Sequence, residues 1–285
     1  MVGFFNVFKP REISSAYVVN KVKKKLGLKC GHMGTLDPLA CGVLPVGVGQ
    51  ASRLFEYLLD KQKTYVATFD FAFCTPSFDL ETEPVKFADY IPEKEEILRI
   101  LPKFIGKISQ TPPDFSAKMV DGKRSYKLAR RGQTVDLPPK TVEIVNIELI
   151  DQNSECTFSF KIDCKGGTYI RSLARDFGSE FSCPATMTFL ERTASGIFNK
   201  QNSVSIDDFL DADDVSKYLI KPDDALSFPK MILSEKEATR ILNGLYDDYS
   251  RFENGFYRVY CEKEFRGVGV VSDGILKIKT YVRDL

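Results

Sequence analysis

Hydrophobic and polar residues alternate along several segments in the way that half-buried strands require. The clearest case is the segment 64–71, where Tyr65, Ala67 and Phe69 fall on one face. Other short apolar runs have the length and the β-branched or aromatic content of buried strands. We therefore expect strands at about 3–9, 43–48, 64–71, 141–150 and 155–164.

Apolar residues at helical spacing predict helices between these strands. Val18, Val22 and Leu26 lie four residues apart on one helix face. Ser14 or Ser15 can cap this helix at its start, and Gly27 follows it as a stop signal. The same kind of pattern predicts helices over about 15–26, 51–59, 92–101 and 169–181.

The order of these elements favours an α+β fold, because strands and helices do not alternate strictly. After about residue 230 the pattern changes to short apolar runs with turn signals at Asn254-Gly255 and Asp273-Gly274. A length of 285 residues fits one large or two ordinary domains. We expect a main domain over 1–229 and a small β-rich domain over 230–285.

The composition is that of a folded protein with little net charge. Hydrophobic residues make up 43% of the chain, and 40 basic residues stand against 39 acidic ones. Any surface for a polyanion must therefore be local. The segment 116–132 has such a local excess, which indicates phosphate binding, although a solvated surface loop is the alternative. It sets six basic residues against Asp121: Lys118, Lys123, Arg124, Lys127, Arg130 and Arg131.

Cysteine and histidine usage limits the chemistry of the chain. The seven cysteines are odd in number and form no Cys-x-x-Cys pair, so we expect free thiols in a reducing cytoplasm. No leader pattern is present, and no apolar run approaches the ~20 residues that cross a bilayer. His32 is the only histidine, which disfavours a zinc site.

The most informative loop surrounds Asp37. Residues 31–38 read GHMGTLDP, a polar stretch interrupted by glycines. Pro38 favours extended backbone at Asp37. An Asp-Pro pair alone is usually only a turn. Likewise, Tyr169-Ile170-Arg171 at a predicted helix start could be one core ring and one surface cation.

Further motifs, in a fixed order, occur before and after this loop over most of the chain. The first run continues as LA at 39–40 and GVLPVGVG at 42–49. One further motif, Lys9-Pro10, precedes this run. The others follow it at 63–65 (KTY), 112–117, 122–126 (GKRSY), 129–132, 167–171 (GTYIR) and 190–193 (LERT). Together these motifs resemble the signature of the TruB family of pseudouridine synthases. Glu12, the run Thr75-Pro76-Ser77-Phe78-Asp79 and Thr82 depart from the family pattern, which loosens expectations about the loop at 75–82.

The resemblance implies a pseudouridine-synthase fold of the α+β class. Its parts are a mixed, largely antiparallel sheet, a thumb insertion at about 111–132 and a small C-terminal PUA-like domain that binds RNA. It further implies a monomeric isomerase that converts the T-loop uridine of tRNA, conventionally numbered 55, to pseudouridine. The family works without a metal or an organic cofactor.

The resemblance also assigns three catalytic residues. Asp37 corresponds to the catalytic carboxylate, and Arg171 to the arginine that pairs with it. Tyr65 corresponds to the tyrosine that lies against the target base, and it is a candidate for removing the proton from C5. The reaction breaks the N1–C1′ bond and joins C1′ to C5, so it needs a group that helps detach the base and a base for this proton.

Further residues match positions that bind the substrate. His32 corresponds to the histidine that fills the RNA loop when the uridine flips out. Tyr169 and Leu190 correspond to walls of the pocket that receives the flipped base. RNA contacts are expected from Lys9, Lys118, Lys123, Arg124, Arg130 and Arg131.

Two other functions share parts of this pattern. The dyskerin branch has the same Asp motif but works with guide RNA and protein partners, and the pattern at 115–132 favours the stand-alone type. A non-catalytic RNA-folding module is the second alternative. The presence of Asp37, Tyr65 and Arg171 argues against binding alone.

Overall fold

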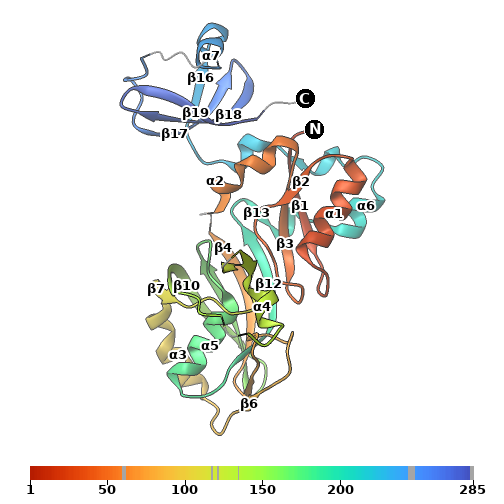
Figure 1. Ribbon diagram of the computed structural model, residues 1–285, viewed down its shortest axis with the longest axis vertical. Helices are drawn as coiled ribbons and strands as arrows, with labels where there is room; N and C mark the ends of the chain where they lie inside the picture. Colours follow the sequence, from red (N-terminus) through yellow and green to blue (C-terminus); the bar gives the residue numbers. More distant parts are fainter. Residues whose placement is uncertain (60–61, 117, 121, 134, 243–247, 283–285) are drawn as a thin grey trace.

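The computed structural model contains one long mixed sheet that joins the two halves of the main body (Figure 1). It describes residues 1–59, 62–116, 118–120, 122–133, 135–242 and 248–282. Within these residues the sheet has eleven strands, and its main path runs β14-β1-β3-β12-β4-β11-β10-β7. The strands of this path are β14 (Val204–Ser205), β1 (Gly3–Lys9), β3 (Cys41–Val48), β12 (Thr186–Ser195), β4 (Lys63–Asp70), β11 (Thr157–Cys164), β10 (Lys140–Gln152) and β7 (Gly106–Gln110).

Most neighbouring strands are antiparallel, which confirms the expected mixed, largely antiparallel sheet. The pairs β1–β14 and β3–β12 are parallel. At β3–β12 the backbone of Gly42 lies so close to Arg192 that an added Cβ would sit 2.3 Å from the Arg192 carbonyl oxygen. Gly42 also has φ of 109°, so glycine is required at this join for two reasons. The smaller strands β2 (Cys30–His32), β13 (Phe198–Asn199) and β15 (Leu219–Ile220) pair alongside.

The helices agree with the predictions in kind, with differences at their ends. Helix α1 (Ser15–Leu26) has the predicted caps, because Ser14 accepts from the Tyr17 amide and Gly27 adopts φ of 67°. The expected helix over 51–59 is instead a 3-10 helix followed by a short α-helix. The remaining helices of the main body are η1 (Gly49–Leu54), α2 (Phe55–Leu59), α3 (Lys94–Ile100), η2 (Leu101–Phe104), α5 (Ile170–Glu180), η3 (Lys200–Asn202), α6 (Ile206–Asp211), η4 (Ser216–Tyr218) and η5 (Pro222–Ala225).

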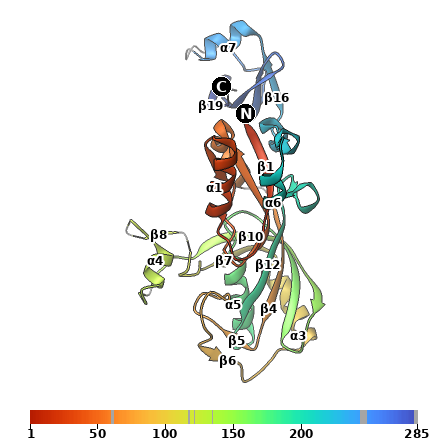
Figure 2. The same ribbon diagram turned by 90° about the vertical axis from the view of Figure 1, so that its right-hand side faces the viewer.

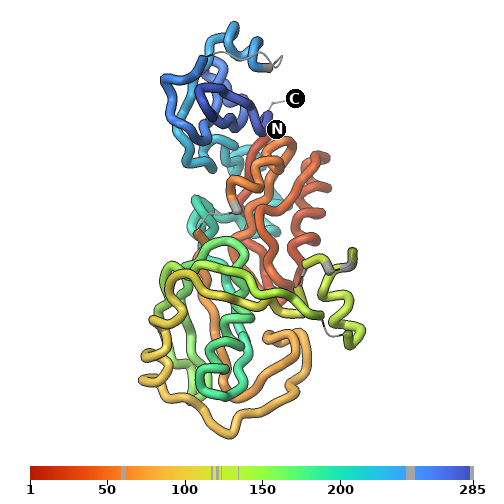
Figure 3. The backbone as a smooth tube through the Cα atoms, turned by 60° about the vertical axis from the view of Figure 1, so that its left-hand side comes forward, coloured from red at the N-terminus to blue at the C-terminus, as the bar shows by residue number. Residues whose placement is uncertain are grey.

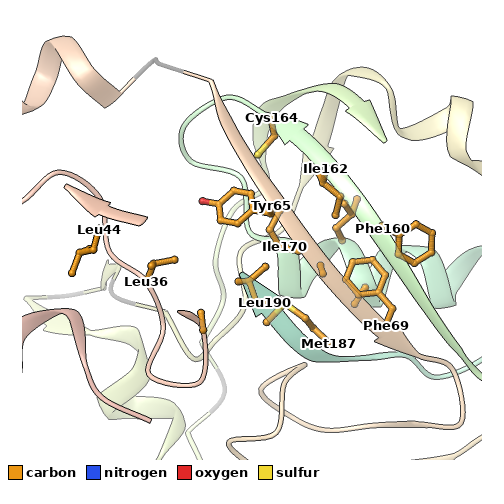
Figure 4. Packing of buried hydrophobic residues seen from close by; sticks show 14 of the residues in the cluster. Leu36, Leu44, Tyr65, Phe69, Phe160, Ile162, Cys164, Ile170, Met187 and Leu190 are labelled. Carbon is orange, nitrogen blue, oxygen red and sulfur yellow. The ribbon is translucent and has the colours of Figure 1, made fainter. Parts of the chain in front are cut away.

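The main hydrophobic core lies between the sheet and helix α5. The rings of Phe69, Phe160 and Phe177 meet with centroids 5.1 to 5.6 Å apart. Figure 4 shows Phe69 and Phe160 in this core, while the Tyr65 hydroxyl points away from them toward the side of Leu36. The same strand, β4, therefore supplies the core ring of Phe69 and the ring of Tyr65, whose hydroxyl points toward the Asp37 loop.

The basic segment forms a small projecting substructure rather than an irregular stretch. It contains a two-stranded ribbon and one helical turn: β8 (Met119–Val120), β9 (Lys123–Arg124) and α4 (Ser125–Ala129). Figure 2 shows β8 and α4 standing out from the body of the molecule. Another two-stranded ribbon lies nearer the body: β5 (Phe73–Cys74) with β6 (Lys86–Phe87). We call residues 111–132 the thumb.

The C-terminal part is a small β-rich unit, as predicted, with an additional helix. Its sheet has the order β16-β17-β18-β19, and Figure 3 shows it at the end of the molecule near the N-terminus. The unit packs on the main body, because Tyr57 and Thr280 share a 2.9 Å hydrogen bond and Val268 joins the cluster around Phe4. The domain boundary at residue 230 stays a prediction. The unit contains β16 (Lys230–Leu233), α7 (Glu235–Leu242), β17 (Gly255–Cys261), β18 (Glu264–Ser272) and β19 (Ile275–Tyr281).

Strand β12 is the main element that the sequence pattern missed. It lies in the middle of the sheet between β3 and β4. Its pairing with β4 shifts register between Met187 and Phe189 and again between Arg192 and Ala194. These bulges disturb the two-residue alternation that identifies a strand. Among the described helices, none combines the length and the apolar character needed to cross a membrane.

Candidate active site

The loop that carries Asp37 is fastened to the protein from several sides. The Ser15 hydroxyl accepts from the Leu36 amide and donates to the Leu36 carbonyl, both at 2.8 Å. The Pro38 carbonyl accepts from the Glu12 amide at 2.8 Å. Ser15 is the first residue of α1, so the helix that the capping signal begins also holds the residue next to Asp37. The loop is therefore pre-organised by bonds that do not involve the Asp37 side chain.

Lys9 belongs to this fastening and does not face the solvent. Its side chain is fully buried, and its ammonium group donates to the carbonyls of Pro10, Ile13 and Pro38 at 2.9, 2.7 and 3.1 Å. Burial lowers the pKa of Lys9 to about 8. We expected Lys9 to contact RNA. This environment corrects that expectation, because the ammonium donors are directed into the protein.

Arg171 connects Asp37 to a second carboxylate. Its Nε lies 2.9 Å from an Asp37 oxygen and 3.6 Å from an Asp79 oxygen. Its terminal nitrogens donate to the carbonyls of Ser77 and Phe115 at 3.1 and 3.0 Å. The Arg171 side chain is 4% exposed and that of Asp37 is 35% exposed. The ion pair therefore has a buried anchor and an acid that reaches solvent.

Asp79 is a site residue that the sequence pattern did not identify. Its side chain is buried and accepts from the Ser77 hydroxyl at 2.6 Å and from the Glu81 amide at 2.9 Å. Burial raises the pKa of Asp79, and the Arg171 cation opposes this shift. The Ser77 and Thr82 hydroxyls lie 2.9 Å apart and close the loop. The available signal was an acid two residues after Ser77 and three before Thr82, positions at which the chain departs from the family pattern.

Asp37 opens into a pocket of about 280 Å³. We call it the Asp37 pocket. Tyr65 and Leu190 line it as buried side chains. Burial raises the pKa of Tyr65, and the Arg192 cation opposes the shift. The lining includes Asp37, Tyr65, Tyr169, Arg171, Leu190 and Arg192.

Tyr169 is held in the wall of the pocket by Gln110. The Gln110 side chain accepts from the Tyr169 amide at 2.9 Å and donates to its carbonyl at 3.1 Å. Gln110 is itself 2% exposed. Tyr169 is the N-cap residue of α5, so the same contact fixes the start of the helix on which Arg171 lies.

A groove of about 480 Å³ adjoins the pocket on the thumb side. We call it the thumb groove. Asp37 and Arg171 line both spaces. His32 also lines the groove, and its Nδ1 is buried without a hydrogen-bond partner among the described residues. Burial lowers the pKa of His32, which favours the neutral ring. From the thumb the groove receives Arg124, Tyr126 and Arg130.

The predicted basic residues of the thumb differ in their surroundings. Arg130 is ion-paired with Glu81 and lies over the Tyr126 ring at 5.6 Å. The Lys118 ammonium lies 5.9 Å from the centre of the Tyr169 ring, which connects the thumb to the Asp37 pocket. Arg124 and Arg131 are exposed. The side chain of Lys123 lies outside the described part of the structure.

The structure thus brings Asp37, Tyr65, Tyr169, Arg171 and Leu190 into one pocket and places His32 in the adjoining thumb groove. A carboxylate, a buried cation and a tyrosine around an apolar-walled space can bind a flat ring and act on the bond that holds it. Within the described residues, no group of three or more His, Cys, Asp and Glu side chains could hold a metal.

Comparisons with known proteins agree with this arrangement. Residues 20–170 match the family model described as "TruB family pseudouridylate synthase (N terminal domain)", and residues 171–226 match "tRNA pseudouridylate synthase B C-terminal domain". Two relatives named tRNA pseudouridine synthase B match along nearly their whole length. That of Clostridium novyi is 38% identical over 98% of this chain and 99% of the relative, and that of Clostridium kluyveri is 36% identical over 99% and 100%. The chain belongs to the TruB family of pseudouridylate synthases.

Solved structures share the fold at lower identity. An H/ACA RNP bound to a substrate RNA containing 2′-deoxyuridine includes a chain that matches with a TM-score of 0.74 and 22% identity, over 99% of this chain and 85% of the other. A Cbf5-Nop10-Gar1 complex includes one with a TM-score of 0.71 and 24% identity, over 99% and 84%. At these identities the likeness confirms the pseudouridine-synthase fold and says nothing further about the site.

Proposed function

We propose that this protein is a tRNA pseudouridine synthase that isomerises the T-loop uridine, position 55, of tRNA. The observation that carries the proposal is the Asp37 carboxylate, 2.9 Å from the buried Arg171 guanidinium at the entrance of an apolar-walled pocket. The family membership supports the reaction class. The basic thumb beside this pocket supports an RNA substrate.

The uridine must leave the RNA stack to react, because C1′ and C5 are not accessible within it. The flipped base enters the Asp37 pocket, where Leu190 and Tyr169 provide apolar contact. His32 lines the adjoining thumb groove, and we propose that it fills the space that the base leaves in the RNA loop. A neutral ring suits this role, because it can stack in the loop without bringing a further charge.

The chemistry then exchanges one bond to C1′ for another. The N1–C1′ bond breaks, and its electron pair stays on the uracil ring. The ring rotates and C5 bonds to C1′; a proton leaves C5, and N1 receives a proton. A carboxylate can assist by adding to the sugar or by taking a proton from it, and both routes use the ionised acid. The contact with Arg171, at 2.9 Å, holds the Asp37 carboxylate in place for either route.

We assign removal of the C5 proton to Tyr65. Its ring lies in the pocket wall and its hydroxyl points away from the core (Figure 4). The raised pKa of Tyr65 keeps the phenol neutral until the intermediate, whose C5 proton is far more acidic than that of uridine, is formed. The phenol oxygen then takes the C5 proton while its own hydroxyl proton passes to solvent water, so the phenol is neutral before and after the step.

RNA binding is proposed to extend from the thumb to the C-terminal unit. Lys118, Arg124, Arg130 and Arg131 can meet phosphates from the thumb side. The small β-rich unit over 230–285 is proposed to be a PUA-like RNA-binding domain. We further propose that the enzyme acts as a monomer. We also propose that it works in the cytoplasm, where its seven free thiols would stay reduced.

The test uses the purified chain and a stem-loop that copies only the T arm. We expect one uridine to become pseudouridine, as measured by nuclease digestion and chromatography of the nucleosides. The matched control is Asp37→Asn, which removes charge but little surface. It should lower the single-turnover rate at least ~100-fold and change RNA affinity less than about twofold.

Three outcomes contradict parts of the proposal. Modification that occurs only after a guide RNA is added would mean a dyskerin-like enzyme. Tight binding without modification by the wild-type chain would mean an RNA-folding module. A rate for Asp37→Asn above a hundredth of wild type would remove Asp37 from the chemistry.

A further inference from the structure

Arg192 is a buried arginine in the wall of the Asp37 pocket. It is 1% exposed and is among the largest side chains buried to that extent in the described residues. Its Nε donates to the Val43 carbonyl at 2.8 Å, and its terminal nitrogens donate to the carbonyls of Gly34 and Thr35 at 3.1 and 3.4 Å. It therefore contacts the loop two to three residues before Asp37 from strand β12.

The charge of Arg192 is not compensated in the way that the charge of Arg171 is. Arg171 meets two carboxylates, those of Asp37 and Asp79. For Arg192, no carboxylate oxygen of a described residue lies within 4.0 Å. Carbonyl oxygens satisfy its donors, but they are neutral and leave a full positive charge in place. A charge in a site from which water is excluded acts over longer distances than one at the surface.

This charge acts on the groups that surround the pocket. Arg192 opposes the rise in the pKa of Tyr65 and lowers the pKa of His32 further. Both effects have the sign of a cation that favours negative and disfavours positive neighbours. Lys63 is a second buried cation that lines the same pocket. Arg192 and Lys63 thus place basic groups of β12 and of the start of β4 in the lining of the pocket, and Arg192 does so next to the loop of Asp37.

We propose that Arg192 stabilises the negative charge that the uracil ring acquires when the N1–C1′ bond breaks. This inference rests on the proposed function. Heterolysis leaves the electron pair of that bond on the ring, so the ring is most negative before C5 joins C1′. Arg192 is fixed by its three carbonyl contacts before the substrate arrives. A preorganised charge of this kind lowers the barrier without needing to reorient during the reaction.

A purely structural role is the alternative, because the same bonds hold the loop of Asp37. The two roles differ in how they depend on the leaving group. Fluorine at C5 withdraws electrons, so a 5-fluorouracil ring carries the negative charge more easily and needs less help from a cation. Misplacement of Asp37 would slow both substrates by the same factor. The leaving group therefore distinguishes an electrostatic effect from a loosened loop.

The experiment measures single-turnover breakage of the N1–C1′ bond in T-arm stem-loops that contain uridine or 5-fluorouridine at the target position. Fluorine cannot leave C5 as a cation, so loss of the N-linked nucleoside is followed by chromatography after digestion. We expect Arg192→Gln to lower the rate on uridine on the order of 100-fold, and on 5-fluorouridine on the order of 10-fold. Arg192→Lys keeps the charge, and its rate on either RNA should stay within about tenfold of wild type.

Ser15→Ala is the matched control for the loop. It removes two hydrogen bonds to Leu36 without changing any charge, and it should slow both RNAs equally. Equal losses on the two RNAs for Arg192→Gln would overturn the proposal in favour of a structural role. If Arg192→Gln does not fold, as judged by thermal melting, Arg192→Lys decides: a loss of about 100-fold or more in a folded protein contradicts the proposal. If the wild-type chain modifies neither RNA, the proposed function fails instead.

Discussion

The Asp37 pocket and the thumb lie side by side and are built in opposite ways. Around the Asp37 pocket, the buried side chains of Lys9, Arg192 and Ser15 hold the loop of Asp37 through its backbone carbonyl and amide groups. In the thumb, the basic side chains are mostly exposed, and Arg130 has an ion pair with Glu81 that is open to solvent. Bond rearrangement requires groups that are fixed before the substrate binds. Phosphate binding requires charges that can reach the RNA. The difference assigns chemistry to one region and affinity to the other.

A large effect, second to that of Asp37→Asn, is expected from Arg171→Lys. A lysine keeps the charge but cannot reproduce a planar group that meets Asp37, Asp79 and two carbonyls together. We expect the single-turnover rate to fall roughly 100-fold, while the affinity for the T-arm stem-loop stays near the wild-type value. A rate within about threefold of wild type would mean that geometry in the pocket matters less than charge.

Asp79→Asn should have a smaller effect on the rate. The Arg171–Asp79 contact is an ion pair at 3.6 Å and not a hydrogen bond, so we expect a loss of roughly 30-fold or less. The free energy of unfolding should not fall with the rate. Because burial raises the pKa of Asp79 in the folded protein, folding binds its proton more tightly, and stability falls as pH rises through that range. At neutral pH the neutral variant should therefore melt no lower than wild type.

Melting and kinetics of Asp79→Asn are to be measured on the same preparation. A lower melting temperature together with a lost rate would mean that Asp79 holds the fold and acts on Arg171 only indirectly. Ser77→Ala offers a matched comparison, because it removes the 2.6 Å hydrogen bond to Asp79 and leaves the charge. Its effect on the rate should be the smaller of the two.

Lys9 predicts a pH dependence of activity. Its pKa is lowered to about 8 in the folded protein, against 10.5 in the unfolded chain. Between these values the unfolded chain holds more protons, so this group makes the fold more stable as pH rises. Activity should fall instead, because a neutral amine has one donor too few for three carbonyls. If only the charged form of Lys9 holds the loop, the rate at pH 9 should be up to about tenfold lower than the rate well below pH 8.

The control for Lys9 is Lys9→Arg, which stays charged in this range. The ratio of the wild-type rate to the Lys9→Arg rate should decline between pH 7 and pH 9. Deprotonation of Lys9 should not lower the wild-type melting temperature over the same range. A constant ratio would show that the Lys9 ammonium does not control the loop.

The thumb variants should affect the rate at saturating RNA least of all. If Arg130 and Arg131 each meet one phosphate, neutralising both flattens the slope of log affinity against log salt by roughly 1.4 to 1.8. Neutralising Lys23 and Lys24 is the control, because both are exposed on helix α1. Equal flattening in the control would deny the thumb a specific role. A large loss of the rate at saturating RNA in the thumb variant would mean that the thumb also takes part in the chemistry, and not in RNA affinity alone.

Local patterns in the sequence predicted much of the frame. The alternation of Tyr65, Ala67 and Phe69 identified β4, and Ser14 with Gly27 marked the two ends of α1. These signals succeed because a strand face, an N-cap and a left-handed stop depend on residues a few positions apart. The pattern failed for β12, where bulges disturb the alternation, and for the helix over 51–59, which is divided.

For the site, the sequence by itself determined the residue types and the loop that presents Asp37. The family motifs added the predictions that Asp37 pairs with Arg171 and that Tyr65 lies in the same site. Only the tertiary structure decided that Asp79 shares Arg171, that Lys9 is buried and that Arg192 holds the loop. These contacts join residues far apart in the chain, such as Arg171 with Ser77 and Arg192 with Val43, which are 94 and 149 positions apart. They depend on the register of the sheet and on burial, and no local pattern encodes either.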